Sequence, residues 1–382
     1  MPSTSAFSSA PVARPGSWVA VPRGSEFELI RAEDVSSTTL SKWCHFQQTN
    51  PELSSGYFHP DFFHAVNAVR GGVELAVLHA GGSVQGLLPF QRVRSTIAHP
   101  AGGMMNDFHG LIAAPESEFD IAALLRDTGL RRFHFHAWTS PANPGTETAT
   151  IFETRESPWI NLSDGLQQYE TWLRQHSTTL RRQPQKTRKL EREIGPVRLE
   201  MDVRDSEVLE KLIQWKREKF CRTRTFDLLS VDWTANLLRE VFQTRGKEFR
   251  GMLSALWAGD QIVAAHFGFI SGNSLHYWFP AYSHEHRIYS PGTLLLHQII
   301  RHAGAENINR IDLGYGDSEL KERFANRQDY VHAGCIGMNR FSREVDRRRY
   351  LLRQMVKQTP FKESLKRVFR PVFPSLGRRA FR

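Results

Sequence analysis

Residues 275–324 constrain the fold of this chain more than any other segment. An apolar, strand-like run (275–281) leads into a turn that contains Pro291 and Gly292, and an apolar helix then continues to about Ala303. A strand that enters a helix through such a turn places free backbone N–H groups and the positive end of the helix dipole together, which is where a phosphate binds. We therefore predict a cofactor site at this turn.

Length and composition favour a soluble protein of two domains with additional tails. A chain of 382 residues exceeds the usual size of one hydrophobic core, and its 40% hydrophobic and 24% charged residues are typical of a globular protein. No run of eighteen apolar residues is present, so we expect no transmembrane helix. Residues 1–25 are predicted to be a disordered arm rather than a signal peptide, which implies a cytoplasmic protein. Three cysteines without a C-x-x-C pair argue against a disulfide framework and against a metal site.

The positive charge of the chain is concentrated in its last 43 residues. The sequence has 50 Lys and Arg against 40 Asp and Glu, a formal net charge of +10. Residues 340–382 contain 14 of the basic and 3 of the acidic residues, a local charge of +11, which leaves 36 against 37, or −1, for the other 339 residues. A neutral body makes nucleic acid an unlikely partner, because binding it needs a basic face on the fold itself.

The order of predicted elements is similar in the two halves of the chain: a strand, two helices, an antiparallel hairpin or meander, a helix and a strand. The first half has predicted strands at 27–31, 73–78, 84–90, 92–98, 111–113 and 131–137, and helices at 38–48, from 60, and 118–127. The second has strands at 159–162, 197–203, 252–257, 262–270, 275–281, 309–313 and 331–338, and helices from 165, at 206–220, 233–244, 291–303 and 319–325. The loop at 139–148, with two prolines and a glycine, is the predicted domain boundary.

A basic segment at residues 178–193 precedes the second of these units. It is interpreted either as a solvated helix face or as part of a surface that meets an anionic substrate or cofactor.

Several runs of residues in the second half resemble the GNAT acyltransferases. The GNAT pyrophosphate motif, R/Q-x-x-G-x-G/A, is matched by Arg287-Ile-Tyr-Ser-Pro-Gly292 at its first and last positions, with Ser290 in place of the first glycine. The wider set consists of Ala264-Ala-His-Phe-Gly268, His276-Tyr-Trp-Phe-Pro-Ala-Tyr282, Tyr289-Ser-Pro-Gly292, Asp312-Leu-Gly-Tyr-Gly-Asp317 and Lys321. Together these runs are similar to the GNAT group associated with bacterial cellulose and exopolysaccharide synthesis, and to the Fem-type transferases, which carry two GNAT-like domains.

The resemblance covers about residues 27–338 and implies a mixed α/β (α+β) fold with tandem GNAT-like domains, each a mostly antiparallel sheet flanked by helices. The predicted units are an arm (1–25), an N-terminal GNAT-like domain (26–148), a C-terminal GNAT acyltransferase domain (149–339) and a basic helical tail (340–382). One departure is Leu320, where the group usually has a tyrosine before Lys321.

Acyl transfer from a CoA thioester needs a cradle for the phosphates, a hydrogen-bond donor for the thioester carbonyl and a base. The predicted cradle is formed by Arg287, Ser290, Pro291, Gly292, Thr293 and Leu294. The predicted catalytic candidates are Asp317, Glu319, His266, His276, Tyr282 and Lys321, and the donor is a main-chain N–H near residues 278–281, where Pro280 would keep a strand edge open. Neither a nucleophilic Ser or Cys motif nor a metal motif is found, so direct transfer is preferred.

Each candidate also has a structural interpretation that the sequence leaves open. Asp317 fits an N-cap of the helix that follows it. The two histidines fit hydrogen-bonded core residues, and Lys321 fits a phosphate contact, a pair with Asp312 or an exposed side chain.

The resulting hypothesis is an acetyl-CoA-dependent N- or O-acetyltransferase that acts on a sugar or saccharide of an exported polysaccharide. The alternative is a GNAT-fold regulatory or membrane-associated binding protein without catalytic activity, for which Ser290 and Leu320 are the supporting departures. Aminoacyl transfer from tRNA, as in the Fem-type relatives, is disfavoured by the neutral body.

The tail repeats apolar residues at helical spacing among arginines and lysines. A basic amphipathic helix of this kind can bind an anionic membrane surface or pack on the body with its basic face in water. A cyclic dinucleotide is a third possibility, because Arg343-Glu-Val-Asp346 fits a short R-x-x-D pattern.

Overall fold

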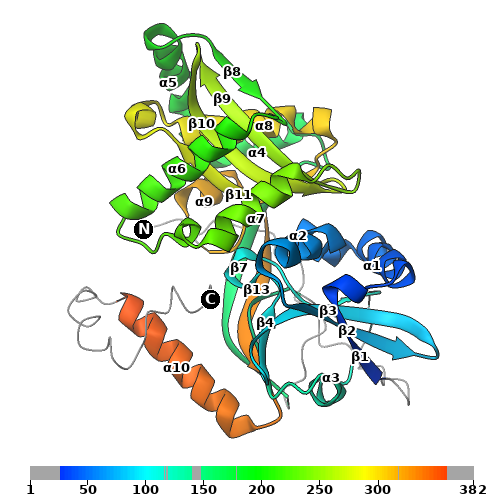
Figure 1. The fold of residues 1–382 in the computed structure, drawn as a ribbon. Coiled ribbons are helices and arrows are strands. Elements are labelled where there is room, and N and C mark those ends of the chain that lie inside the picture. Colours follow the sequence, from blue (N-terminus) through cyan, green and yellow to red (C-terminus); the bar gives the residue numbers. More distant parts are fainter. Residues whose placement is uncertain are drawn as a thin grey trace.

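The computed structural model describes residues 26–115, 117, 119–139, 148–177, 179–316 and 318–358. The predicted arm at 1–25, the candidate base Asp317 and the tail from residue 359 onwards lie outside these residues. Within the described part, thirteen strands form one mixed sheet with helices on both faces (Figure 1).

The first half of the chain builds one end of this sheet. Its elements are β1 (Glu26–Arg31), α1 (Ser37–Thr49), α2 (Pro60–Arg70), β2 (Val73–Ala80), β3 (Ser83–Arg94), β4 (Ile97–Pro100), β5 (Ile112–Ala113), α3 (Ile121–Asp127) and β6 (Arg132–Trp138). The single strand predicted at 92–98 is divided between β3 and β4, because the chain turns at Ser95 and Thr96 and the two strands pair with each other.

The second half builds the other end and adds a helix after the last strand. Its elements are β7 (Ala149–Asn161), α4 (Leu166–His176), α5 (Thr179–Glu193), β8 (Val197–Glu200), α6 (Ser206–Arg222), α7 (Asp232–Gln243), β9 (Phe249–Ala258), β10 (Gln261–Ser271), β11 (Ser274–Tyr282), α8 (Pro291–His302), β12 (Arg310–Asp312), α9 (Glu319–Phe324), β13 (Arg327–Ile336) and α10 (Arg340–Gln358). A 3₁₀ segment, His284–Tyr289, joins β11 to α8.

The two halves have the same strand arrangement. The order β1-β2-β3-β4-β6 in the first half corresponds to β8-β9-β10-β11-β12 in the second, and in each half the last two of these strands are parallel. This is the repeated order that the sequence predicts, and the mixed α/β fold is confirmed.

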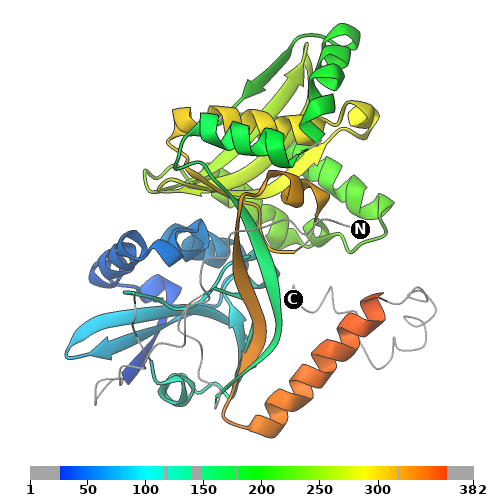
Figure 2. The ribbon, with the colours of Figure 1, turned by 180° about the vertical axis from the view of Figure 1, so that it is seen from behind.

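Two long strands, β7 and β13, join the halves (Figure 2). β7 directly follows the first half but pairs with β12 of the second, whereas β13, at the end of the second half, pairs with β6 of the first. The two strands also pair with each other in antiparallel register along most of their length. The sequence predicts only the ends of these strands, since most side chains between residues 150 and 157 are polar and only partly buried.

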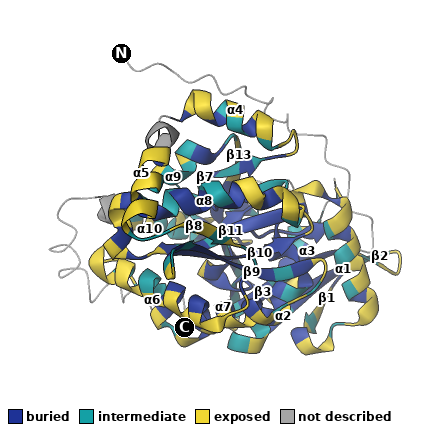
Figure 3. Cartoon of the chain, turned by 90° about the horizontal axis from the view of Figure 1, so that it is seen from above, coloured by how far each residue is buried: buried dark blue, intermediate teal, exposed yellow. Residues whose placement is uncertain are grey.

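Three apolar clusters fill the space between sheet and helices, and the central strands of the second half are buried (Figure 3). The largest cluster joins the halves: Tyr57 and Phe62 of the first half contact Phe269 of the second, with ring centroids 4.9 and 5.9 Å apart. A second cluster lies under α4 and α8. The buried aromatic contacts between the halves hold residues of both beside the edge of β11.

Candidate functional site

The strand β11 separates from its neighbour β12 at the centre of the second half. β11 and β12 are paired only from Ser274 to His276, whereas on its other side β11 remains paired with β10 as far as Tyr282. The separation begins at a β-bulge, where two residues of β11, Tyr277 and Trp278, lie opposite Gly268 of β10. A bulge bends its strand and increases the local twist, and it therefore opens the edge of β11 towards the helices.

Gly268 is needed for this bulge. A Cβ atom at this position would lie 2.0 Å from the carbonyl oxygen of His276, so no other residue fits without moving the strand. The sequence prediction of an open edge near residues 278–281 is consistent with this geometry, although the bulge begins earlier in the strand than Pro280.

The N-terminus of α8 is free of side-chain caps, as an anion site requires. Ser290 is its N-cap in a left-handed conformation (φ 54°), its side chain caps no N–H of the helix, and Pro291 occupies the first helical position. Gly292 packs under Tyr282, because a Cβ atom there would lie 3.3 Å from the tyrosine ring. Arg287 is exposed, and its guanidinium donates to the His284 carbonyl oxygen at 3.2 Å.

The basic helix α5 contributes to the same helix end. Lys186 Nζ donates to Ser290 Oγ at 2.6 Å, and Lys189 Nζ lies 5.8 Å from the ring centroid of Tyr289. Of the two interpretations of the basic segment, this placement favours a surface that meets an anion. Lys189 is also paired with Glu193 at 4.0 Å, so Lys186 is the cation that contacts the uncapped end of α8 directly.

Lys216, which the sequence analysis missed, lies at the open part of β11. It projects from α6, which packs across β10 and β11, and its Nζ donates to the carbonyl oxygen of Pro280 at 3.0 Å. Burial, together with the nearby charges of Lys219 and Lys321, lowers the pKa of Lys216 to about 7. An amine with this pKa is neutral in a large fraction of molecules at physiological pH, and it can therefore accept a proton.

A signal in the sequence points to Lys216. The apolar stripe of α6 follows helical spacing through Leu209, Leu212 and Ile213, and the next position of that stripe is Lys216. Lys216 could therefore have been found from the sequence as a lysine that lies in the apolar stripe of a helix.

The first half also contributes to the site. Asp107 Oδ2 lies 3.2 Å from His276 Nε2, and a Cβ atom on Gly314 would lie 3.0 Å from Asp107 Oδ2 and 3.8 Å from Lys321 Nζ. Lys321 itself donates to the carbonyl oxygens of Gly314 and Tyr315, at 3.0 and 2.8 Å. Asp107, His276 and Lys321 thus meet where β12 ends.

The remaining catalytic candidates are dispersed. His266 is fully buried, and burial lowers its pKa to about 3, so it is a neutral core residue stacked on Tyr277. Glu319 is exposed and pairs with Arg323 on the surface of α9, away from the other candidates. Tyr282 lies at the first turn of α8, beside the predicted phosphate cradle.

Asp317 lies outside the described residues, but the alternative role proposed for it is filled by another side chain. Ser318 is the N-cap of α9, with its Oγ accepting from the Lys321 N–H at 3.3 Å. This is the position next to Asp317, which itself is not described.

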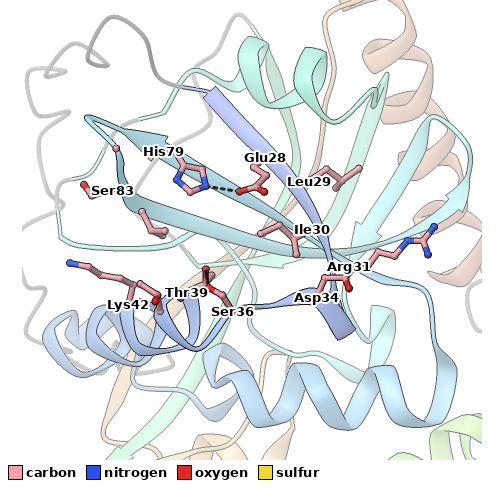
Figure 4. A pocket seen from close by; sticks show the side chains of 13 residues that line it. Glu28, Leu29, Ile30, Arg31, Asp34, Ser36, Thr39, Lys42, His79 and Ser83 are labelled. Carbon is pink, nitrogen blue, oxygen red and sulfur yellow. Dashed lines mark hydrogen bonds and ion pairs between the residues drawn. The ribbon is translucent and has the colours of Figure 1, made fainter.

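A cavity of about 700 Å³ in the first half lies apart from these residues (Figure 4). It is lined by residues of β1, α1 and the β2–β3 hairpin, among them Glu28, which pairs with His79 at 2.9 Å. None of its lining residues belongs to α8 or β11.

Comparison with known proteins identifies the domain that carries the uncapped helix end. Residues 174–322 match a family model described as "Acetyltransferase (GNAT) domain". This segment is similar to GNAT acetyltransferase domains and makes up somewhat less than half of the chain. The match includes the basic helix, the bulged strand and the cradle, and it supports an acyltransferase that uses an acyl-CoA. No protein of curated function matches the chain in sequence.

Solved structures extend the likeness to both halves. FemX is 11% identical, covers 84% of this chain and 100% of its own, and has a TM-score of 0.56. A conserved protein of unknown function from Bacteroides thetaiotaomicron VPI-5482 is 11% identical with a TM-score of 0.51, covering 81% of this chain and 99% of its own. The C-terminal domain (DUF2156) of a proposed lysylphosphatidylglycerol synthetase from Agrobacterium fabrum is 10% identical with a TM-score of 0.50, covering 79% and 92%. At these identities the likeness shows the fold.

Proposed function

We propose that the second half transfers an acetyl group from acetyl-CoA directly to an amine or hydroxyl of an acceptor. The observation that carries this proposal is the uncapped N-terminus of α8, which lies beside the open edge of β11 and whose N-cap, Ser290, is contacted by Lys186. Together, the helix dipole, the N–H group of Gly292 and the Lys186 ammonium can hold the phosphates of CoA.

When bound, CoA supplies the thioester whose carbonyl carbon is attacked. The acceptor nitrogen or oxygen forms the new bond to that carbon, the carbon–sulfur bond breaks, and the acceptor loses a proton. Lys216 accepts the proton as a neutral amine, and its ammonium form returns a proton to the departing thiolate. Lys321 acts through Lys216, since its positive charge helps to keep the pKa of that amine low.

The acceptor in this proposal is a sugar or saccharide of an exported polysaccharide. Its support is the resemblance of residues 264–268, 276–282 and 312–321 to the exopolysaccharide-associated GNAT group. His276 and Asp107 provide polar groups from both halves where such an acceptor would meet the thioester.

The test introduces an aspartate at the N-cap of α8, as in the first half, where Asp120 caps α3. We expect Ser290→Asp to weaken acetyl-CoA binding about 100-fold in calorimetry, because the carboxylate occupies the helix N–H groups and repels the phosphates. Ser83→Asp, an exposed change in the β2–β3 turn with the same added charge, serves as the control and should bind normally. If Ser290→Asp is folded by circular dichroism and binds with unchanged affinity, the cradle is wrong.

A turnover assay distinguishes an acetyltransferase from a binding protein without catalytic activity. Release of the CoA thiol is measured with amino sugars, neutral oligosaccharides and, for comparison, simple amines. Acetyl-CoA binding without turnover on any acceptor would support the regulatory alternative, and faster turnover on the simple amines than on the sugars would overturn the saccharide assignment.

A further inference from the structure

The helix α10 is attached to the body by its polar side. Arg343 is only 2% exposed and donates to the carbonyl oxygen of Gly337 and, at 3.1 Å, to Thr150 Oγ1. One turn later, Asp346 accepts from Arg132 at 2.9 Å. These contacts fix α10 beside β7 and β13, at the edge of the molecule (Figures 1 and 2).

The same contacts involve both charged residues of the R-x-x-D pattern, Arg343 and Asp346. Its arginine and its aspartate are both used to attach α10, so this arrangement gives no support to a cyclic-dinucleotide site at that pattern. Asp346 also lies near His134 and Cys335, a group that could in principle hold a metal ion. Burial, however, raises the pKa of the Cys335 thiol to about 12, and Arg132 already neutralises Asp346, so the group fits an attachment of α10.

Several apolar residues of α10 are exposed, whereas Tyr350 packs on Phe152 of the body. Phe341 is 79% exposed, Leu352 42% and Met355 58%. At 100° per residue these three positions lie within about 60° of one another and on the side opposite Arg343. An exposed apolar stripe of this kind is a candidate contact surface.

Arginines border this stripe. Arg348 lies within it and Arg349 beside it, with side chains 80% and 62% exposed. Glu344 and Asp346, the acidic residues of α10, are each paired with arginines. Within α10 itself, seven Lys and Arg stand against these two acidic residues. The surface thus combines apolar side chains with an excess of positive charge.

We propose that α10 binds the surface of an anionic phospholipid bilayer. Phe341, Leu352 and Met355 enter the boundary between headgroups and acyl chains, and the flanking guanidinium groups contact headgroup phosphates. A second copy of this chain fits the surface less well, because it would bring two rows of arginines together. Among the described residues no helix is long and apolar enough to cross a bilayer, so the proposed contact is peripheral.

The test is sedimentation of the full chain with vesicles. We expect binding to vesicles of 70% phosphatidylcholine and 30% phosphatidylglycerol, little binding to pure phosphatidylcholine, and about tenfold weaker binding of Phe341→Ser/Leu352→Ser/Met355→Ser. Val93→Ser/Met104→Ser removes two exposed apolar residues elsewhere and should bind as the unchanged chain does. Raising the salt concentration should weaken the contact, since screening acts on the arginines.

Two outcomes would overturn the proposal. One is equal sedimentation of the triple variant and the unchanged chain with the anionic vesicles. The other is a concentration-dependent dimer in analytical ultracentrifugation that the triple variant abolishes while vesicle binding is absent, since this result would assign the stripe to a second copy of the chain. The result is independent of acetyl-CoA binding, because α10 contributes no residue to the cradle.

Discussion

The two halves of this protein share a strand order, but the N-termini of two corresponding helices, α3 and α8, differ in their caps. In the first half, Asp120 caps α3 and its Oδ1 accepts from the N–H groups of Ala122 and Ala123 at 2.8 and 3.1 Å. In the second half, the corresponding helix α8 begins at Ser290, whose Oγ contacts Lys186 and caps no N–H. A carboxylate occupies the anion position of α3 permanently, so only α8 can offer that position to a ligand.

A second difference concerns lysine. Residues 26–139 contain a single lysine, Lys42, which is exposed on α1. The second half places Lys216 against the open strand β11, where burial lowers its pKa to about 7. The first half instead contributes support: its Tyr57 packs against His276 and Trp278 of β11, and its Asp107 contacts His276. The comparison places the proposed chemistry in the second half, with the first half packed against the same strand.

The largest expected effect tests whether Lys216, which has no counterpart in the first half, is the base. Lys216→Met should lower kcat about 100- to 1,000-fold and leave acetyl-CoA affinity unchanged, because it removes the base and not the cradle. In the unchanged chain the neutral amine is the active form, so kcat/KM should rise with pH through about 7, and this rise should be absent in the variant.

Lys211→Met, an exposed change on the same helix near Trp215, is the matched control and should keep both rate and pH profile. A normal rise with pH in Lys216→Met would assign the base to another residue.

The next effect tests the bulge that opens β11. Gly268→Ala should lower the free energy of unfolding by about 3 kcal/mol, because the new Cβ overlaps the His276 carbonyl oxygen and the strand must shift. Urea unfolding measures the change. Gly304→Ala, where a Cβ meets nothing within 4 Å, should be neutral. Equal stabilities of the two variants would contradict the role given to Gly268.

The smallest effect tests the cap of α3. Asp120→Ala should reduce stability by about 1 kcal/mol through loss of an N-cap, with acetyl-CoA binding at the second half unchanged. Calorimetry would also reveal whether the variant binds a second equivalent of acetyl-CoA. A second equivalent would mean that the cap alone distinguishes the two helix ends, and that the basic residues near α8 contribute little.

Much of the fold follows from local patterns in the sequence. The meander at β9–β11 and the turn into α8 are recognisable because apolar runs, glycine turns and Pro291 occur at the spacing that these elements need. The cradle residues 290–294 accordingly lie at the first turn of α8, where the sequence places them. The central parts of β7 and β13 escape prediction, since their polar side chains are held in extended conformation by pairing with distant strands rather than by an apolar pattern.

The sequence by itself determined the mixed α/β class, the repeated order of elements and the helix end that can bind an anion, because each depends on residues close to one another in the chain. Only the tertiary structure decided which side chains meet there. Lys216 contacts Pro280 across 64 residues, and Asp107 meets His276 across 169. It also decided that α10 uses Arg343 to attach to the body and directs Phe341 outwards. An amphipathic pattern shows that a helix has two faces, whereas the partner of each face depends on contacts made after the chain has folded.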